Sequence, residues 1–592
     1  MGGDKPHLTR SSEETAKLMK VAMGESAADL AVVNAKVLNV YTGEILDGYS
    51  VCVWDRWIAY VGKSPGDAIG PHTRVIDANG KILIPGFIDG HGHIAWTSTA
   101  ENFLEYAISG GTTTIVTETL EPYPVGGLEG LLDFLESLKD QPIKIFATAP
   151  GMVSTSRTSI GISMEDLKEL LQREDIIGLG ETYWQGVVQD PEVYLPPLME
   201  TLRIRKTLEG HTAGANEKKL MAYLAAGITS CHEPIKADEV LDRLRLGLHV
   251  MVREGSVRRD LETISKIKDA GIDLRRLILA SDGVQPAELL ERGYMEYIVQ
   301  KAIDCGFDPV EAIRMATLNV AEHFRLDDLI GGIAPGRYAD MVLIPDMGTI
   351  RAEYVVSNGK VIAQDGKLLV PPRRHTFAPR SLNSIKLKKR LKSEDFAIRA
   401  PGHGATARVR VIAMVTDLVT RELIQEVPVT DGEIFADPGC DILKIAAVER
   451  TRQPGKIFVG LIQGFGLKSG AMASSGAWDT RDIIVVGARE SDMALAVNRI
   501  CELQGGTVVS NEGKIIEEIP MPVFGIMSQL PIRELDQKIK ALWNAVSRLG
   551  VPFPNPTLSL VTLTTAAIPF LRICEEGLVN IKDGKTLGLF PT

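Results

Sequence analysis

The sequence places two histidines one residue apart at the end of an apolar run, in the segment PGFIDGHGHI. Side chains alternate between the faces of a strand, so His91 and His93 should point the same way and suit one metal site. Four further residues of ligand type each close a later apolar run: Glu181, His211, His232 and Asp282. Imidazole and carboxylate groups hold divalent cations that activate water. The pattern therefore predicts a two-metal hydrolytic centre.

Each of these residues has an ordinary structural explanation when it is taken alone, because a single histidine often only fills a core position. The set is harder to explain in that way. The chain has ten histidines, and four of them belong to this set. His211 follows Glu181 by about 30 residues, which is the length of one strand–helix unit. Since strand ends gather at one face of a barrel, we expect the six side chains to meet there.

The elements that must position these residues change in character along the chain. Residues 84–329 alternate apolar strands with helical stretches, a pattern typical of a (β/α)8 TIM-type barrel. Residues 28–83 and 330–372 are short apolar runs broken by turn residues, and they predict one small β-sandwich domain made by both flanking segments. Residues 400–592 mix strands and helices and predict an additional C-terminal α/β domain. The expected fold class is α/β throughout.

Two remaining segments are predicted to lie outside these domains. Residues 1–27 are polar with a helical tendency and indicate an N-terminal arm, and residues 373–399 indicate a linker. The linker carries eight Lys and Arg between positions 373 and 392, which could also be taken for a nucleic-acid patch. The chain as a whole has a net charge of −11, and no aromatic ladder accompanies the basic stretch. We therefore expect a solvated linker and no nucleic-acid partner.

The composition indicates a soluble globular protein rather than a membrane or secreted one. No window approaches the roughly 18 uninterrupted apolar residues that a membrane span needs. The N-terminal residues lack the apolar core of a secretory signal. The six cysteines are scattered without a CxxC pair, as is usual for reduced thiols. The sequence thus predicts a cytoplasmic protein with no membrane partner.

Several longer segments resemble one family of enzymes. The order HxH, Glu, His, His, Asp on a barrel flanked by a β-domain resembles the amidohydrolase superfamily. More narrowly, the chain resembles the bacterial and archaeal adenine deaminases over nearly its whole length. The segments that carry this resemblance are LIPGFIDGHGHI, EGHTAGANEKKLMAYLAAGITSCHE, GGIAPGRYADMVLI, GFGLKSGAMASS and IIVVGARESDMALAVN.

The resemblance implies a mechanism and a cofactor. Glu181 would bridge two divalent cations, expected to be Mn or Fe with Zn as a further option, and the cations would lower the pKa of water to about 7. The resulting hydroxide would attack a ring carbon of a purine or other N-heterocycle, while Asp282 takes its proton as general base. Glu233 is the candidate for protonating the ring nitrogen; its alternative role is that of a surface acid capping a helix. A homo-oligomer is also expected.

The chain departs from the adenine deaminase pattern at polar positions outside the ligand set. The substituted positions include Ala95-Trp96-Thr97-Ser98 for a Glu-Ser-Ser run, Leu120 for a histidine, Gly283 for an aspartate, Tyr294 for a histidine, and Trp478 and Arg481 for two histidines. A site that reads its substrate through hydrogen bonds discriminates steeply, so the loss of these groups favours a changed substrate. The candidates for substrate binding are Glu121, Arg253, Glu254, Trp478 and Asp479. For Arg253 and Glu254, a buried ion pair that supports the barrel is the alternative.

Three functions stay open at this point. The first is a hydrolytic deaminase of adenine or a related aminated heterocycle, which yields hypoxanthine or the corresponding oxo product and ammonia. The second is an amidohydrolase with the same two-metal chemistry that cleaves another cyclic or open C–N bond. The third is a metal-binding homologue without turnover, which is disfavoured because buried polar ligands are costly unless the metals are used.

Overall fold

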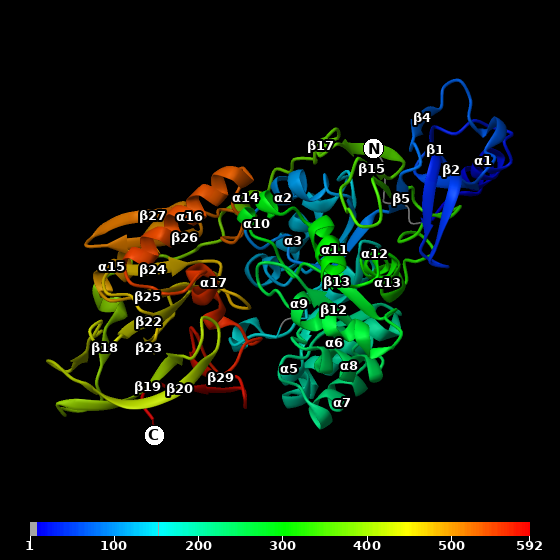
Figure 1. The fold of residues 1–592 in the computed structure, drawn as a ribbon. Coiled ribbons are helices and arrows are strands. Elements are labelled where there is room, and N and C mark those ends of the chain that lie inside the picture. Colours follow the sequence, from blue (N-terminus) through cyan, green and yellow to red (C-terminus); the bar gives the residue numbers. More distant parts are fainter. Residues whose placement is uncertain (1–8, 152, 592) are drawn as a thin grey trace.

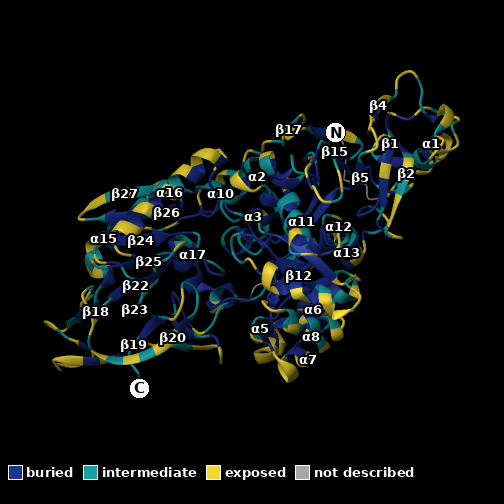
Figure 2. Ribbon diagram, in the orientation of Figure 1, coloured by how far each residue is buried: buried dark blue, intermediate teal, exposed yellow. Residues whose placement is uncertain are grey.

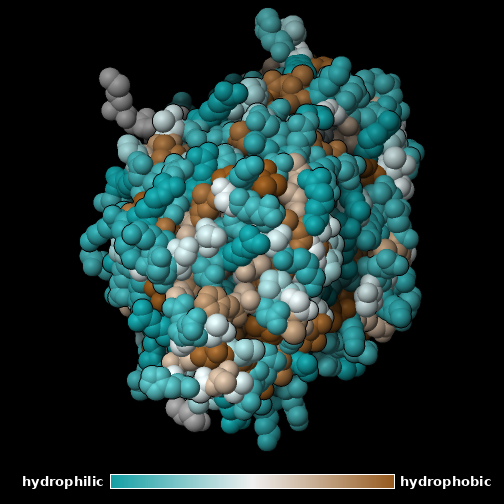
Figure 3. Space-filling view, turned by 90° about the vertical axis from the view of Figure 1, so that its left-hand side faces the viewer, coloured by the Kyte–Doolittle hydropathy of each residue, from teal (hydrophilic) through white to brown (hydrophobic). Residues whose placement is uncertain are grey.

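The computed structural model describes residues 9–151 and 153–591. Figure 1 shows the barrel between two other parts, with a β-domain (blue) on one side and the C-terminal domain (yellow to red) on the other. The face of the C-terminal domain seen in Figure 3 is largely hydrophilic, with scattered apolar spots. Among the described residues, no helix has both the length and the apolar character needed to cross a membrane.

Eight parallel strands form the barrel within the described residues. They are β6 (Phe87–Gly92), β7 (Thr112–Thr117), β8 (Lys144–Ala149), β9 (Ile176–Tyr183), β10 (Thr207–His211), β11 (Ser230–Cys231), β12 (His249–Arg253) and β13 (Leu277–Ala280). Strands β6 to β10 pair in order, as do β11 to β13. Backbone hydrogen bonds close the ring, from Thr229 N to Leu208 O at 2.9 Å and from Asp282 N to His91 O at 3.0 Å.

Helices cover the outside of the barrel, and Figure 2 shows the buried strands inside a partly exposed helical layer. The helices are α2 (Ala100–Ala107), α3 (Pro122–Leu138), α4 (Met164–Leu171), α5 (Trp184–Gln189), α6 (Pro191–Arg203), α7 (Glu217–Ala225), α8 (Ala237–Arg245), α9 (Leu261–Ile264), α10 (Pro286–Glu291), α11 (Met295–Asp304), α12 (Pro309–Met315) and α13 (Leu318–His323). Helix α4 shows how the sequence sets such an element: the Ser163 hydroxyl accepts the Asp166 N–H and caps its start, while Leu167 and Leu170 are buried.

The strands divide their apolar side chains between two cores. Ile88, Met251 and Ile278 pack together inside the barrel. Val250 and Val252, the neighbours of Met251 along β12, pack outward against the helices. This is the alternation expected of a strand that is buried on both faces. It leaves the ends of the strands as the place where polar side chains can reach a solvent-accessible site.

Segments on both sides of the barrel in sequence form the β-domain. Its strands are β1 (Leu30–Asn39), β2 (Glu44–Trp54), β3 (Trp57–Gly62), β4 (Arg74–Asp77), β5 (Ile82–Pro85), β14 (Met341–Ile344), β15 (Tyr354–Ser357), β16 (Lys360–Gln364) and β17 (Lys367–Leu368). They pair in the order β17-β16-β15-β14-β5-β1-β2-β3, with β4 beside β1. The antiparallel pair β5–β14 joins the two segments, with Ile84 opposite Val342. Helix α1 (Ser12–Ala22) buries Leu18 and Val21.

The basic stretch after the β-domain is more ordered than a solvated linker. Arg373 Nε donates to Lys139 O at 2.8 Å, and His375 Nε2 lies 2.9 Å from an Asp133 oxygen, so this stretch is fastened to α3 and the residue that follows it. Further along, Leu391 and Phe396 are buried. The short helix α14 (Pro379–Leu382) lies between these two regions. The expectation of a solvated segment missed these contacts because basic composition does not show which backbone carbonyls or carboxylates lie within reach.

The C-terminal domain is built on one large mixed sheet. Its strands are β18 (Ile398–Arg399), β19 (Thr406–Met414), β20 (Thr420–Pro428), β21 (Glu433–Ile434), β22 (Ile442–Glu449), β23 (Ile457–Gln463), β24 (Ala471–Ser474), β25 (Asp482–Gly487), β26 (Gly506–Asn511), β27 (Lys514–Pro520), β28 (Leu571–Cys574), β29 (Gly577–Asn580) and β30 (Lys585–Leu587). The large sheet runs β20-β19-β23-β22-β25-β24-β26-β27. Helices α15 (Glu490–Leu503) and α16 (Ile532–Arg548) each pack into a separate hydrophobic core. Successive residues of β22 point alternately into these two cores.

The C-terminal domain reaches the barrel through direct hydrogen bonds. Ser528 N donates to Thr97 O at 2.9 Å, next to the HxH segment. Ser154 Oγ donates to Asp479 O at 2.5 Å. Helix α17 (Pro556–Val561) and the segment after it lie near the same contact region, and Trp478 N donates to Val561 O at 3.2 Å. The expected fold class, a TIM-type barrel with a flanking β-domain and an extra α/β domain, is confirmed.

Candidate metal centre

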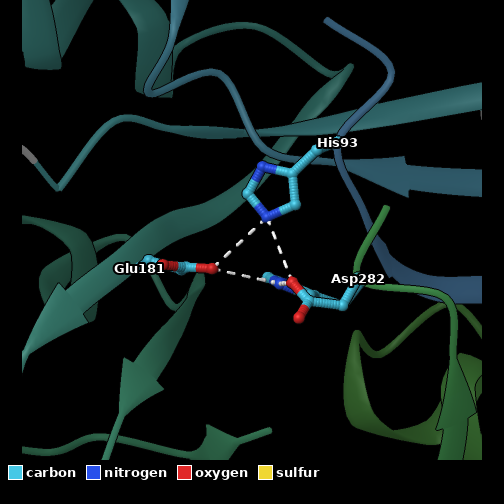
Figure 4. Close-up of side chains that lie close together, drawn as sticks. His93, Glu181 and Asp282 are labelled. Atoms are coloured by element: carbon cyan, nitrogen blue, oxygen red, sulfur yellow. Dashed lines mark ion pairs between the residues drawn. The ribbon is translucent and has the colours of Figure 1, made fainter. Parts of the chain in front are cut away.

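The ends of five barrel strands bring all six predicted ligands together, since His91 and His93 both lie at the end of β6. His91, His93, Glu181 and Asp282 each offer a ligand atom, and these atoms lie within 4.8 Å of one another. Glu181, His211 and His232 form a second such group with the same limit. Figure 4 shows His93, Glu181 and Asp282 pointing toward one another. Since Glu181 belongs to both groups, the arrangement can hold two cations that share one carboxylate.

Short distances around Glu181 define the centre of this cluster. Its Oε1 atom lies 3.2 Å from His91 Nε2, 3.4 Å from His93 Nε2 and 3.2 Å from His232 Nε2. Burial opposes the ionisation of Glu181, but the charge of His232 and the nearby ring nitrogens of three histidines hold the pKa of Glu181 well below its usual range. The carboxylate is therefore ionised and ready to bridge.

Orphaned ring nitrogens show that the cluster fits a metal. His91 Nε2 and His211 Nδ1 are buried, and neither has a hydrogen-bond partner among residues 9–151 and 153–591. A buried nitrogen without a partner costs about 1–3 kcal/mol. A cation would use the lone pair of each ring, and it would also offset the charge of the neighbouring carboxylates. The donor set of imidazoles and carboxylates suits Zn, Fe or Mn.

Glu121 fixes the orientation of one of the ligand rings. Its Oε1 atom lies 2.5 Å from His93 Nδ1, on the side of the ring away from Glu181. Nδ1–H donation to a carboxylate leaves Nε2 as the metal-binding nitrogen and makes it more basic. Glu121 was predicted to bind substrate; the structure places it on the cavity wall and in contact with a ligand histidine.

Arg253 and Asp282 form a buried ion pair beside the centre. Arg253 Nη1 lies 3.1 Å from Asp282 Oδ2, and Nη2 donates to Asp260 Oδ2 at 3.1 Å. Burial acts to raise the pKa of Asp282, but the ring nitrogens of His91 and His93 at 3.5 Å and the charge of Arg253 hold it well below its usual range. Asp282 also adopts a left-handed φ of 58°, a conformation that non-glycine residues adopt mainly where surrounding contacts enforce it.

Glu233 lies inside the cavity and is not a surface acid. Its Oε1 atom is 2.9 Å from His232 Nε2, and its Oε2 accepts the Thr212 hydroxyl at 3.1 Å and the Thr212 N–H. Burial opposes ionisation, but the charges of His211 and His232 hold the pKa of Glu233 below its usual value. The side chain thus enters the site as a carboxylate that can accept a proton before it donates one.

The C-terminal domain contributes two of the predicted substrate-binding residues to the cavity. Trp478 faces Trp96 of the barrel edge to face, with ring centroids 6.3 Å apart. Asp479 accepts the Tyr183 hydroxyl at 3.2 Å and the Ala566 N–H at 3.1 Å. Burial raises the pKa of Asp479 to about 7. Both side chains line the cavity that contains the ligand cluster.

Glu254 is not brought to the cavity. Its side chain is buried against α11, where it accepts Lys301 Nζ at 2.7 Å. Adjacent strand residues face opposite sides, so Arg253 points to the cavity and Glu254 to the helical layer. Glu254 therefore has the alternative role, that of a buried ion-pair residue that supports the barrel. Arg253 forms an ion pair and also lies on the cavity wall.

Two departures from the adenine deaminase pattern are coupled in space. Gly283 has φ of 130°, and a Cβ at this position would meet the Trp96 ring at 3.0 Å. A larger residue at position 283 would therefore press against the Trp96 ring, and the ring would have to shift by a few tenths of an ångström. Leu120 lines the same part of the cavity as Trp96 and Trp478. The three side chains form an apolar wall beside the metal ligands, which we call the aromatic wall.

Asp89 is a functional position that the sequence reasoning missed. Its Oδ1 accepts the N–H groups of His91 at 3.1 Å and Ser281 at 3.2 Å, and its Oδ2 accepts the Ser281 hydroxyl at 2.5 Å and the Tyr294 hydroxyl. Burial raises the pKa of Asp89 despite these bonds. The carboxyl ties β6, which carries the HxH pair, to the segment that carries Asp282. A polar residue two positions before His91 in an otherwise apolar strand was the available signal.

Comparisons with known proteins agree with this geometry. The amidohydrolase family model matches residues 82–364, and the adenine deaminase C-terminal domain model matches residues 417–585. The adenine deaminase of Moorella thermoacetica is 36% identical over 588 residues and covers 98% of both chains. That of Clostridium botulinum strain Langeland is 34% identical with 98% of both chains covered, and that of Cenarchaeum symbiosum is 33% identical with 96% of this chain and 94% of its own. The resemblance seen in the sequence is confirmed, and the chain belongs to the adenine deaminase family of amidohydrolases.

Proposed function

We propose that this protein is a metal-dependent hydrolase that deaminates adenine or a related aminated N-heterocycle to the oxo product and ammonia. The observation that carries the proposal is the pair of ligand groups that share Glu181, placed next to the Arg253–Asp282 ion pair in one cavity. The relatives named adenine deaminase, which match nearly the whole chain, support adenine as the first substrate to test.

The residues divide naturally between two cation positions. His91, His93 and Asp282 would hold one ion, His211 and His232 the other, and Glu181 both. Two divalent cations, which we propose to be Mn or Fe with Zn as the alternative, would supply hydroxide at neutral pH by lowering the pKa of water. Glu121 keeps the His93 ring turned so that Nε2 faces Glu181.

The chain's own acids and bases can move the two protons that hydrolysis requires. Asp282, kept ionised and oriented by Arg253, takes the proton of the attacking water. Glu233, on the cavity wall beside His232, is our candidate for exchanging a proton with the ring nitrogen. A C–O bond forms at the ring carbon and the C–N bond breaks. One proton of the water goes to the departing amino group, which leaves as ammonia, and the other stays on the oxo product.

A second candidate is hydrolysis of a different C–N bond by the same centre. The aromatic wall of Trp96, Leu120 and Trp478 favours it, because these side chains stand where the family pattern has polar ones. Loss of hydrogen-bonding groups changes which substrate is accepted while it leaves the water-activating residues in place.

The test is turnover by the protein reconstituted separately with Mn, Fe and Zn. We expect adenine to be converted to hypoxanthine with one ammonia released for each molecule consumed. His91→Ala should abolish the reaction while its thermal unfolding stays close to that of the wild type, since barrel packing does not depend on this ring. Turnover of cyclic amides with none of adenine would replace the first candidate by the second.

We also propose a cytoplasmic location and a homo-oligomeric assembly. A cytoplasmic location is supported by six cysteines that form no disulfide. The mass of the protein in solution tests the homo-oligomer directly.

A further inference from the structure

The cavity at the metal centre is far larger than a single heterocyclic ring requires. Its volume is about 820 Å³, and it runs from the metal ligands to an outer part formed jointly by the barrel and the C-terminal domain. Pockets of 300–1,000 Å³ are typical for ligands of drug size. We propose, resting on the function proposed above, that the true substrate is an aminated heterocycle with a neutral apolar substituent, and that this substituent occupies the outer part of the cavity.

The outer part of the cavity is lined by large apolar side chains from two domains. Met221, Ile235 and Leu246 come from the barrel, and Leu418, Ile568 and Pro569 come from the C-terminal domain. We call these six residues the apolar channel. Met221, Ile235 and Leu246 are 54%, 37% and 43% exposed. Exposed apolar residues that gather at the entrance of a polar catalytic site are the ordinary sign of an apolar ligand group.

The inner part of the cavity accounts for the ring itself. The aromatic wall offers two indole rings, held edge to face by the contact between Trp96 and Trp478. Aromatic faces bind planar heterocycles by offset stacking. A ring placed between this wall and the metal ligands would leave the apolar channel in contact with water only. A substituent on the ring would remove that apolar surface from water, at about 25 cal/mol for each Å².

The charged residues at the entrance favour a neutral substituent over an anionic one. Arg245 pairs with Asp242 at 3.8 Å, and Arg258 pairs with Asp260 at 3.1 Å. Arg243 donates to the carbonyl of Ala215 at 3.1 Å and to Thr212. Each of these guanidinium groups is thus already engaged by the protein. A phosphate or carboxylate on the substrate would have to compete with these carboxylates and carbonyls for the guanidinium groups, whereas an alkyl or aryl group would not.

A homologous series of substrates tests the proposal. The metal-loaded protein is given adenine and its N6-n-alkyl and 9-n-alkyl derivatives, from methyl to butyl, and formation of the 6-oxopurine is followed. In the N6 series, a C–O bond forms from water, the C–N bond breaks, and the nitrogen leaves as a primary amine. We expect kcat/KM to rise about fourfold for each methylene in at least one series, since a buried methylene contributes about 0.8 kcal/mol. The series that shows the rise identifies the ring position that faces the channel.

Failure of this inference and failure of the proposed function give different results. Turnover of adenine with flat or falling kcat/KM in both series would overturn the apolar substituent and leave deamination standing. Absence of turnover for every purine would refute adenine deamination as the proposed function. In that case the dissociation constants of the same compounds, measured by calorimetry, decide the inference: tighter binding by about fourfold for each methylene supports it, and unchanged binding overturns it.

A pair of methionine variants separates the channel from general surface effects. Met221→Glu places a charge at the entrance of the channel, while Met199→Glu places one on α6, at a methionine that is 46% exposed and outside the cavity lining. We expect Met221→Glu to reduce the advantage of the butyl compound over adenine by about tenfold, and Met199→Glu to leave it unchanged. Equal effects of the two variants, or none in either, would contradict the assignment of the channel.

Discussion

Arg253 Nη1 and Asp282 Oδ2 lie 3.1 Å apart, while the other Asp282 oxygen lies 3.5 Å from Nε2 of both His91 and His93. The Asp282 carboxylate therefore contacts the Arg253 guanidinium on one side and the histidines of the ligand cluster on the other. Asp260 in turn holds the Arg253 guanidinium in place through a second ion pair. This relationship explains how a group that must accept a proton can stay ionised while buried.

Replacing Arg253 should therefore change the pH profile. Loss of its charge raises the pKa of Asp282, so the acidic limb of kcat/KM should move to higher pH by roughly one unit in Arg253→Met. The shift should be smaller in Arg253→Lys, because lysine keeps the positive charge but cannot contact Asp282 and Asp260 at the same time as arginine does. The pH dependence of kcat/KM for the three proteins measures this. An unchanged limb in Arg253→Met would mean that Arg253 does not tune Asp282.

Removing the carboxylate that orients His93 should weaken metal binding. We expect Glu121→Gln to lower the affinity for the divalent cation by about 10–100-fold, the usual effect of losing an outer partner of a ligand histidine. Competition with a chelator measures the affinity. Glu254→Gln is the matched control, because Glu254 pairs with Lys301 outside the cavity. Equal losses in the two variants would show that Glu121 acts only on overall stability.

Asp89→Asn should disturb the centre by weakening the hydrogen bonds that tie β6 to the segment that carries Asp282. The amide oxygen can still accept the N–H groups of His91 and Ser281, but the NH2 group would face the hydroxyls of Ser281 and Tyr294, which donate to Asp89 in the wild type. A buried donor left without an acceptor costs about 1–3 kcal/mol. We expect the free energy of unfolding to fall by that amount and kcat to fall with it, whereas Tyr294→Phe removes one donor and should cost less. Urea unfolding and steady-state kinetics check both values, and a fully stable, fully active Asp89→Asn would contradict the positioning role.

A second buried acid predicts how stability depends on pH. Burial opposes the ionisation of Glu209, but the charge of His323 and hydrogen bonds from His323 and Ser230 lower its pKa to about 2. The pKa of Glu209 in the folded protein lies below its value of about 4.3 in the unfolded chain. The ionised carboxylate therefore stabilises the fold above pH 4.3, and this stabilisation is lost as the pH falls toward 2. Glu209→Gln should lose about 3 kcal/mol at pH 7 and much less at pH 3. A difference that does not shrink on acidification would refute this assignment.

Much of the site could be predicted from the sequence because it depends on local rules. The ligands each close an apolar strand, and strand ends in a barrel must converge. The partners of the ligands could not be predicted in this way. Asp89 and Tyr294 are far apart in sequence and meet only because β6 and the segment after β13 are neighbours. The pairing of β6 with β7 also contains an irregularity between Asp89 and Gly92, which alternation of side chains does not foresee.

The opposite orientations of Arg253 and Glu254 show the same limit. Both belong to one sequence motif, so the motif alone gave them the same two possible roles. Only the direction of each side chain at the end of β12 separates a cavity residue from a helix contact. Trp478 of the C-terminal domain could likewise be named as a candidate from the sequence, but its contact with Trp96 could not be predicted. The two rings meet only after both domains have folded.

If Glu181 is shared by two cations, its loss should remove one of them, and a metal titration of the wild type and Glu181→Gln measures this. We expect the wild type to bind two divalent ions for each chain and the variant to retain at most one tightly bound ion. Glu254→Gln, the control outside the cavity, should bind two. Two equally tight ions in Glu181→Gln, or a single ion in the wild type, would contradict the shared centre.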